Sequence, residues 1–532
     1  MERKILKNKF FLYITEFFSG MSVMAVELGA SRLLAPYFSS SQIVWTIIIG
    51  TIMIAMALGN IFGGRSADKN GNPDKLYRRI LIAAVWIAAI PLLGKYVIVG
   101  IAGLLIISIN QNFLIIAAFL ACMIVFVFPL FLLGTVTPSL AKFSVDSLDD
   151  SGKVVGTLGA YNTIGSIIGT FLPTFVTIPS VGTSITFFIF GGILLLLCLI
   201  YFISVKKSAV RVAISSVIFI LCMIFGHSTS FAFWEDDLTY EGESVYNYLQ
   251  VAENDQSIWL STNVLFGVQS ITTKGDRLTG MYYDYALAAP LMAGVEEQDE
   301  AKILILGMGT GTYARQALRY FPNASMEGVE IDEKITELSH QYFDLPEEVK
   351  TVNYDGRAYL QALEGQYDVI MVDAYQDITI PFQMSSVEFF SQVRAHLKEG
   401  GVMVVNLNMK TDDPEGINVY LADTIGSVFS EIYMVDVPNS TNRILFASVE
   451  GGMKEVFEDA RGSLTSDDMK RLMQKVSDGL FSYEAGNHIL TDDKAPVEVL
   501  GMRVIDSLIM EEMQYYKEVY RQEGLQGLLN SL

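Results

Sequence analysis

The sequence has 532 residues, of which 51% are hydrophobic and 18% are charged, and its mean hydropathy is +0.38. Soluble proteins contain about 25% charged residues, so part of this chain is expected to lie in lipid; collagen-like, disordered and disulfide-rich secreted classes are excluded. Residues 1–234 contain 16 Lys and Arg against 8 Asp and Glu, whereas residues 235–532 contain 21 against 50. This acidic second half argues against nucleic acid as a partner and favours a small cationic partner, because negative fields concentrate cations.

Long apolar runs fill the first half of the chain. Each meets the length of about 20 residues that a helix needs to cross the hydrocarbon core. They lie at about 10–35, 42–62, 79–108, 112–140, 154–178, 183–204 and 211–230. We therefore predict a transmembrane domain of about seven helices at residues 1–234, with the lipid bilayer as its partner.

The first apolar run contains the ionisable residues Glu16, Glu27 and Arg32. An ionisable residue within a membrane span is a functional-site hypothesis by default. The structural alternatives are a contact between Glu27 and Arg32 and side chains that extend to the membrane interface.

The second half shows two patterns and a closing segment. Short alternating stretches at 235–295, separated by Asn, Asp and Gly, predict a small antiparallel β subdomain. Apolar strands that alternate with helical patterns at 296–450 predict a doubly wound Rossmann-like domain. Residues 451–532 are predicted to form a helical segment that completes this half.

Glycines and carboxylates gather at the predicted strand ends of the Rossmann-like domain. Gly307, Gly309 and Gly311 follow the first strand, and Glu330 follows about 20 residues later, near the end of the second strand. This spacing is typical of an adenosine-bearing cofactor site, with the acidic residue on the ribose hydroxyls. Asp355-Gly356 and Asp373 lie at or just beyond two further strand ends, and ligands collect at that edge of an open sheet.

Two cofactor classes fit this spacing. NAD is compatible with it, but the loop G-M-G-T-G-T lacks the third glycine that the dinucleotide fingerprint requires. The pattern therefore favours a cofactor of the S-adenosylmethionine type. His and Cys residues show no metal-ligand spacing, so no metal is predicted.

Ordered motifs along nearly the whole chain resemble the spermidine synthase (polyamine aminopropyltransferase) family, and more closely its membrane-fused branch with a transporter-like N-terminal half. In the first half the resemblance rests on ELGASRLLAPYFSSSQIVWTIIIG, GGRSADKNG, GTLGAYNTIGSIIG and PSVG. In the second half it rests on SVYNYL, GVQSI, MYYDYAL, LILGMGTGT, GVEID, NYDGRAYL, MVDAYQDITIP and LTDDKAPVE. It implies a multi-pass α-helical membrane domain joined to an α/β methyltransferase-type domain with the spermidine synthase fold.

The resemblance also implies site roles. Cofactor binding is assigned to Asn247, Gln269, Gly307, Gly309, Thr310, Gly311, Glu330, Asp355 and Gly356. Of these, Asn247 and Gln269 would bind the thioadenosine moiety, and Asp355-Gly356 the adenine. Substrate binding is assigned to Tyr282, Asp284, Tyr375 and Asp377. Asp373 would be the catalytic acid/base that faces the attacking amine.

The chain departs from the soluble family members at three positions. Thr310 stands where they have an Asp that pairs with the aminopropyl ammonium. Gln376 stands where they have a second Asp, with Asp377 one step later, and Tyr282-Tyr283-Asp284 replaces a Tyr-His-Glu segment. With Thr310 there, one reason to prefer decarboxylated S-adenosylmethionine over S-adenosylmethionine is absent.

The predicted function is that of a membrane-bound aminopropyltransferase of polyamine biosynthesis, which transfers an aminopropyl group from decarboxylated S-adenosylmethionine to an amine such as putrescine. Two alternatives remain open: an S-adenosylmethionine-dependent methyltransferase acting on a small acceptor, and a non-catalytic polyamine-binding or transport protein. A homo-oligomer is compatible with the sequence.

The predicted location is the plasma membrane, but two arguments about topology disagree. Basic residues in the connections at 63–79 and 204–211 place the N-terminus in the cytoplasm by the positive-inside rule. Seven spans would then place the acidic half outside. The cofactor is cytosolic, so we expect a cytoplasmic catalytic half. One resolution is that the 79–108 run crosses twice, and another is that the 211–230 run lies in the interface or re-enters.

Overall fold

The computed structural model describes residues 8–504 except 39–40, 109–112, 146–150, 228–229, 234–237, 265–267, 276, 375–379, 409 and 412, and in addition 514–515, 518–519 and 521–522. The chain forms two compact units. The first comprises Met1–Asp236, Glu241–Leu249 and Asn263–Phe266, and the second Asp237–Tyr240, Gln250–Thr262 and Gly267–Leu532.

The first unit is a bundle of helices. They are α1 (Lys9–Phe38), α2 (Gln42–Lys69), α3 (Pro73–Ser108), α4 (Phe113–Val125), α5 (Val127–Gly134), α6 (Val136–Ser144), α7 (Ser151–Leu172), the π-helical η2 (Pro173–Thr177), α8 (Ile178–Val205) and α9 (Ala209–Gly226). Among the described residues, six helical stretches are long and apolar enough to cross a membrane. One of them, Ser151–Val205, contains both predicted runs 154–178 and 183–204; Gly182 interrupts it with non-helical backbone angles (φ 80°, ψ 170°).

The predicted run at 112–140 is divided among three helices, and prolines explain the division. Pro129 has no backbone N–H to donate to the carbonyl of Val125, so the regular helical bond is missing there. The indole Nε1 of Trp86, on α3, donates to that carbonyl instead, at 2.9 Å. This hydrogen bond therefore joins the interrupted segment to the neighbouring helix α3.

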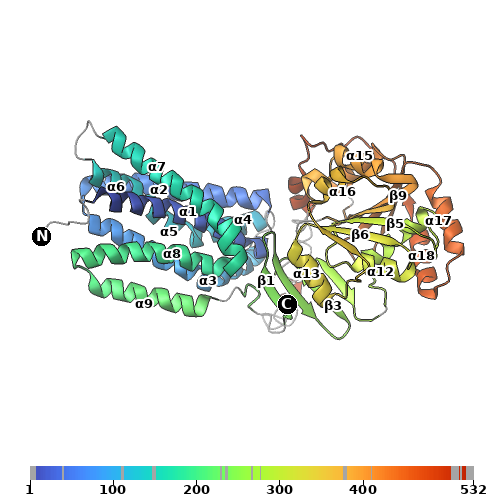
Figure 1. Cartoon of the computed structure of the whole chain (residues 1–532), viewed down its shortest axis with the longest axis horizontal. Coiled ribbons are helices and arrows are strands. Elements are labelled where there is room, and N and C mark those ends of the chain that lie inside the picture. The colour runs from blue at the N-terminus through green and yellow to red at the C-terminus, as the bar shows by residue number, and fades with distance from the viewer. Residues whose placement is uncertain are drawn as a thin grey trace. The chain divides into compact units, whose positions relative to one another are not determined.

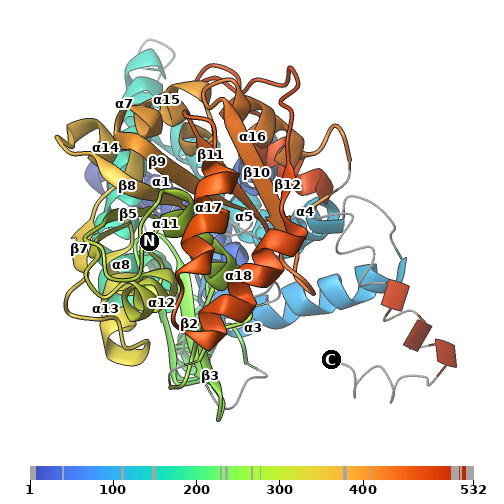
Figure 2. The same cartoon turned by 90° about the vertical axis from the view of Figure 1, so that its right-hand side faces the viewer.

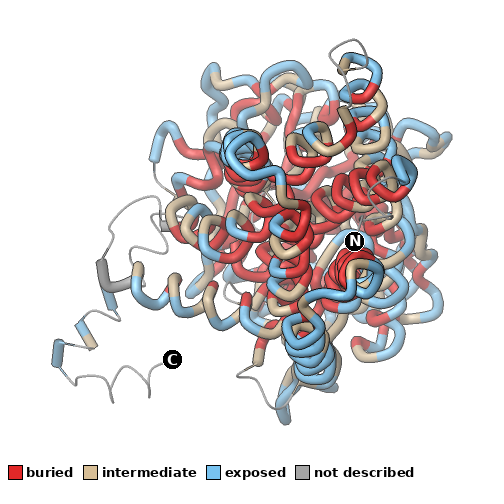
Figure 3. Tube along the Cα trace, turned by 90° about the vertical axis from the view of Figure 1, so that its left-hand side faces the viewer, coloured by how far each residue is buried: buried red, intermediate tan, exposed pale blue. Residues whose placement is uncertain are grey.

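Glycines allow α1 and α7 to pack backbone against backbone. A Cβ atom at Gly165 would lie 2.0 Å from the carbonyl oxygen of Phe17, and one at Gly169 would lie 2.1 Å from that of Met21. Only glycine fits such an approach, as at close helix crossings in membranes. Figure 3 shows buried residues gathered inside the bundle, with exposed residues on its outward faces.

Four short strands follow the helices: β1 (Tyr240–Glu243), β2 (Tyr248–Glu253), β3 (Ser257–Ser261) and β4 (Ser270–Thr273). They form a sheet in the order β1-β2-β3-β4, in which β2, β3 and β4 pair antiparallel. The antiparallel sheet predicted before the Rossmann-like domain is present.

The second unit is built on an eight-stranded sheet in the order β12-β10-β11-β9-β8-β5-β6-β7. Its strands are β5 (Lys302–Leu306), β6 (Ser325–Glu330), β7 (Lys350–Asn353), β8 (Tyr367–Val372), β9 (Leu397–Leu407), β10 (Glu431–Asp436), β11 (Arg443–Ser448) and β12 (Phe481–Ser482). Strands β7, β6, β5, β8 and β9 are parallel, whereas β11 and β10 are antiparallel additions. The chain order reverses between β5 and β8, which is where doubly wound sheets bind ligands.

Helices cover both faces of this sheet (Figures 1 and 2). They are α10 (Tyr282–Ala286), α11 (Ala288–Met292), α12 (Thr312–Tyr320), α13 (Glu333–Tyr342), α14 (Gly356–Ala362), η3 (Phe382–Met384), α15 (Val387–Ala395), α16 (Ile417–Gly426), α17 (Met453–Gly462) and α18 (Asp467–Gly479). One apolar core joins α10–α12, the sheet and the late helices α17 and α18. Helices α17 and α18 therefore pack against the same core as the sheet.

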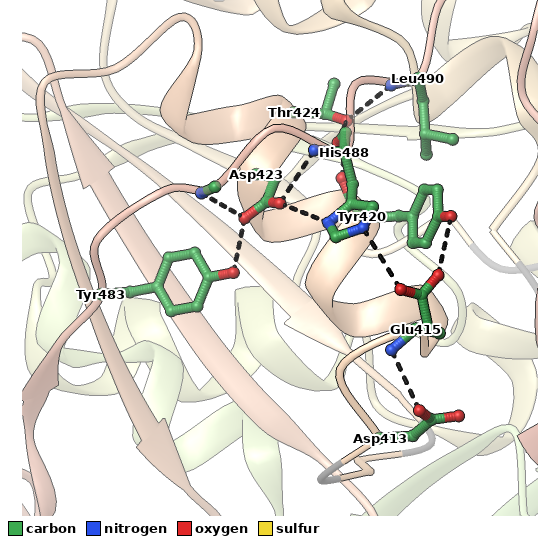
Figure 4. A network of polar contacts seen from close by, with 9 residues as sticks. Asp413, Glu415, Tyr420, Asp423, Thr424, Tyr483, His488 and Leu490 are labelled. Carbon is green, nitrogen blue, oxygen red and sulfur yellow. Dashed lines mark hydrogen bonds and ion pairs between the residues drawn. The ribbon is translucent and has the colours of Figure 1, made fainter.

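The segment after β12 is fastened to α16 through Asp423, whose buried carboxylate accepts four hydrogen bonds (Figure 4). The donors are the hydroxyl of Tyr483, the backbone N–H of Gly486, and both the backbone N–H and Nδ1 of His488, at 2.6–3.0 Å. Burial alone would raise the pKa of Asp423, but these bonds hold it below its ordinary value. Asp423 is therefore ionised in the folded protein at neutral pH.

Candidate functional site

The glycine loop lies against the end of β8. Gly307, Gly309 and Gly311 all have positive φ, at 85°, 56° and 79°. A Cβ atom at Gly307 would lie 2.6 Å from both the carbonyl oxygen of Asp373 and the Cα of Ala374. Glycine at 307 is therefore required for the ends of β5 and β8 to meet, and that contact brings the predicted cofactor loop to Asp373.

Asp373 is a partly buried carboxyl held by two neutral donors. The hydroxyl of Tyr282 donates to Oδ2 at 2.6 Å, and the amide Nδ2 of Asn406 donates to Oδ1 at 2.9 Å. Burial raises the pKa of Asp373 to about 7, opposed by the two hydrogen bonds and assisted by the nearby charge of Glu330. A carboxyl with such a pKa can take and return a proton near neutral pH.

Asn406 is a site residue that our sequence reasoning missed. Its Oδ1 accepts from Nδ2 of Asn442 at 2.8 Å, and Oδ1 of Asn442 accepts from the hydroxyl of Ser440 at 2.5 Å. This relay fixes which end of the Asn406 amide faces Asp373. The available signal was an Asn that directly follows the apolar run VMVV in β9, where a buried amide needs hydrogen-bond partners.

Glu330 binds the glycine loop directly. Its Oε2 accepts from the N–H of Gly309 at 2.9 Å, and its Oε1 accepts from the N–H of Asp332 at 3.0 Å. Burial raises the pKa of Glu330 to about 7, although these backbone bonds oppose the shift. A carboxylate offers about four acceptor positions, so lone pairs remain for the ribose hydroxyls that the sequence predicts there.

Thr310 belongs to a neutral cluster of hydroxyl groups. Its Oγ1 lies 2.6 Å from Oγ of Ser270 and 3.2 Å from Oγ1 of Thr312. Tyr283 donates to Ser270 at 3.3 Å, and its ring lies on that of Tyr282, with the centroids 3.9 Å apart. This position of the loop therefore offers hydroxyl groups and no negative charge.

The carboxylates of two predicted acidic residues accept hydrogen bonds within local turns. Asp284 is buried and accepts from the backbone of Thr279 and Gly280 and from the Thr279 hydroxyl. Asp355 caps α14 by accepting from the N–H of Ala358 at 2.8 Å. Sequence patterns do not separate such capping carboxylates from ligand-binding ones, because both favour strand and helix ends.

The remaining predicted residues are distributed along the chain. Gly356 lies at the same sheet edge, since a Cβ atom there would be 3.7 Å from that of Leu306. Gln269 donates its backbone N–H to Leu260 and directly precedes the hydroxyl cluster. Asn247 lies in the first unit, and Tyr375 and Asp377 lie outside the described residues.

Comparisons with known proteins identify the family that the chain resembles. Residues 289–460 match the family model described as "Spermine/spermidine synthase domain". A "Probable polyamine aminopropyl transferase" of Bifidobacterium longum is 51% identical over 351 residues, which is 63% of this chain and 78% of the relative. A "Polyamine aminopropyltransferase" of Vibrio vulnificus is 25% identical over 243 residues, 44% of this chain and 80% of the relative.

One solved structure to which this chain is similar is that of a probable spermidine synthase from Corynebacterium glutamicum. It is 20% identical, has a TM-score of 0.36, and aligns with 48% of this chain and 99% of its own.

Replacing Asn406 tests the relay. Asn406→Leu removes a bond that stabilises the carboxylate, so we expect the pKa of Asp373 to rise further. A hydrogen bond to a charged group contributes about 1.5–3 kcal/mol, so the acid limb of the kcat/KM profile should move upward by about one to two pH units. Turnover should recover at high pH, and Asn323→Leu, at an exposed position, should leave the profile unchanged. An equal loss at every pH would show that Asn406 does not act through this ionisation.

Proposed function

The chain belongs to the polyamine aminopropyltransferase family, and on that premise we propose that its second unit transfers an aminopropyl group from decarboxylated S-adenosylmethionine to an amine such as putrescine. The enzyme is a transferase. The observation that most favours this reaction is the Asp373 carboxyl, held by Tyr282 and Asn406 against the glycine loop.

The reaction requires a neutral amine. Its nitrogen lone pair attacks the aminopropyl carbon next to the sulfonium, so that a C–N bond forms while the C–S bond breaks and a neutral thioether leaves. The nitrogen must lose a proton, and Asp373 would accept it. A base with a pKa of about 7 combines an ionised fraction at neutral pH with enough basicity to take the proton.

The cofactor would lie along the glycine loop. Gly307, Gly309, Thr310 and Gly311 would approach its sulfonium side, Glu330 would hold the ribose, and Asp355-Gly356 the adenine. Gln269 would contact the thioadenosine moiety. Tyr282, Asp284, Tyr375 and Asp377 would line the amine side. No metal is required, because the sulfonium supplies its own leaving group.

Replacing Asp373 tests the base. We expect Asp373→Asn to lower kcat by about 10²–10⁴-fold, the usual contribution of a general base, with the cofactor still bound. The control is Asp368→Asn, on the same strand but engaged with Lys398 and the backbone of Lys302, which should retain turnover. Products are identified with decarboxylated and intact cofactor, each labelled on its transferable group. Unchanged turnover in Asp373→Asn, or a methylated amine as product, would refute this function.

We also propose that the first unit inserts into the plasma membrane. Large apolar side chains are exposed on the outer faces of its helices. They include Met53 and Phe62 on α2, Ile164 and Phe171 on α7, and Ile214 and Phe225 on α9. Such a surface is unstable in water but is matched by lipid.

The contacts of the first unit define its two ends. The connection after α8 lies near the beginning of α3, where Tyr201 donates to Asp74 at 2.5 Å and Lys207 pairs with the same carboxylate. The chain leaves α9 at the end where α1 finishes, since Tyr37 donates to the carbonyl of Phe231 at 2.9 Å. Helix α3 is continuous from Pro73 to Ser108, so a double crossing of the 79–108 run, one of the two resolutions considered, does not occur.

We propose a cytoplasmic second unit, because the reaction needs a cosubstrate made in the cytosol. The basic connections at 63–79 and 204–211, which the Asp74–Lys207 pair joins at one end of the unit, are then both external, against the statistical positive-inside rule. Cofactor supply is an absolute requirement, whereas the charge rule is a bias.

Labelling in intact cells tests this topology. The native cysteines Cys122, Cys198 and Cys222 are buried, so background labelling should be low. With a membrane-impermeant thiol reagent, Arg211→Cys should react, whereas Glu455→Cys should react only after the cells are permeabilised. Both positions are exposed. Labelling of Glu455→Cys in intact cells would place the second unit outside.

A further inference from the structure

A fully buried carboxyl lies where three helices of the first unit meet. Oε1 of Glu16, on α1, accepts from the hydroxyl of Thr137 on α6 at 2.5 Å and from Nδ2 of Asn162 on α7 at 2.8 Å. Oε2 is buried and has no hydrogen-bond partner among the described residues. None of the ion pairs described for the chain includes Glu16.

An ionised Glu16 would be costly in this position. Both of its partners are neutral and both donate to the same oxygen, so the charge on the other oxygen would be buried without a described hydrogen-bond donor to compensate it. Burying an uncompensated charge is among the most unfavourable events in a protein, and such groups usually neutralise instead. The bare oxygen therefore needs a cationic occupant.

The geometry distinguishes the candidate occupants. A divalent metal ion would need about six or more oxygen ligands, whereas Thr137 and Asn162 turn hydrogens toward Glu16. An alkylammonium needs space, but a Cβ atom at Gly20 would lie 2.5 Å from the carbonyl oxygen of Asn162, and one at Gly165 would lie 2.0 Å from that of Phe17. A proton needs only the one oxygen.

We propose that Glu16 is a proton-binding site of the membrane unit, whose Oε2 carries an exchangeable proton. Release of the proton leaves a carboxylate that must be hydrated, and this requires α1 to separate from α6 and α7. The structure offers a place for such a movement, because the helix is interrupted at Thr135, two residues before Thr137. Interrupted helices accompany ion sites in membrane carriers. The inference rests on the proposed insertion of the unit into a bilayer, not on the reaction at Asp373.

Glu27 supplies the matched control. It lies on the same helix, about 16 Å further along, and is only partly buried. The structure gives it no ion pair with Arg32, which donates to the carbonyls of Ser244 and Val245 instead. The sequence offered a contact between Glu27 and Arg32 as an alternative, and the described structure contains no ion pair between them.

Infrared difference spectroscopy on the full chain in lipid vesicles tests the site. Flotation with the vesicles is scored first, and failure to float would overturn both the insertion and this inference. The wild-type-minus-Glu16→Gln spectrum at neutral pH should contain the C=O stretch of one protonated carboxylic acid. The band should disappear at high pH, and Glu27→Gln should retain it. Glu16→Gln resembles the protonated form and should fold.

Asn162→Leu provides a second variant. It removes one donor, so the carbonyl band should move to higher frequency and persist to higher pH. Backbone hydrogen exchange in α1, corrected for the intrinsic pH effect, should increase on deprotonation in the wild type but not in Glu16→Gln. A carboxylate band at neutral pH, a band that does not respond to pH, or an unchanged band in Asn162→Leu would each overturn the proposal.

Discussion

A carboxyl held by neutral hydrogen-bond donors, with no cation beside it among the described residues, is the constraint on which the site depends. Asp373 has this environment because Gly307 lets the end of β5 pack against its backbone, and because Tyr282 and Asn406 occupy its two oxygens. A lysine or arginine there would hold the carboxylate ionised and weakly basic. Tyrosine and amide donors keep its orientation fixed while burial keeps its proton affinity high.

The same physics recurs in the first unit with a different outcome. Among the described residues Glu16 likewise receives neutral donors, but it is fully buried and both donate to one oxygen. In the second unit the Asp373 carboxyl lies at the sheet edge next to the glycine loop, so proton exchange can accompany the proposed reaction. In the bundle the carboxyl lies between helices, so proton exchange can accompany only a change in their packing.

Sequence patterns predicted the site residues whose positions follow from the ends of neighbouring strands. Parallel strands end at one edge, so the positions of Gly307, Glu330 and Asp373 along the chain were sufficient to predict their meeting. Asp284 and Asp355 show the limit, because a carboxylate that caps a turn looks the same in sequence as one that binds a ligand. Asn406 was missed because its role depends on Asn442, 36 residues away, which an antiparallel strand pairing brings to it. The course of the helices in the first unit depended on Gly182, Pro129 and the continuity of α3, which hydropathy averages over.

Direct titration of Asp373 is the most decisive test of this account. Infrared difference spectra between the wild type and Asp373→Asn, recorded on the full chain without substrates across the pH range, isolate this carboxyl from Glu330 and Glu16. The account predicts a protonated C=O band that converts to carboxylate bands with a midpoint near pH 7. A carboxyl already ionised well below pH 5, like an ordinary exposed aspartate, would contradict the claim that burial prepares Asp373 to accept the proton of the amine.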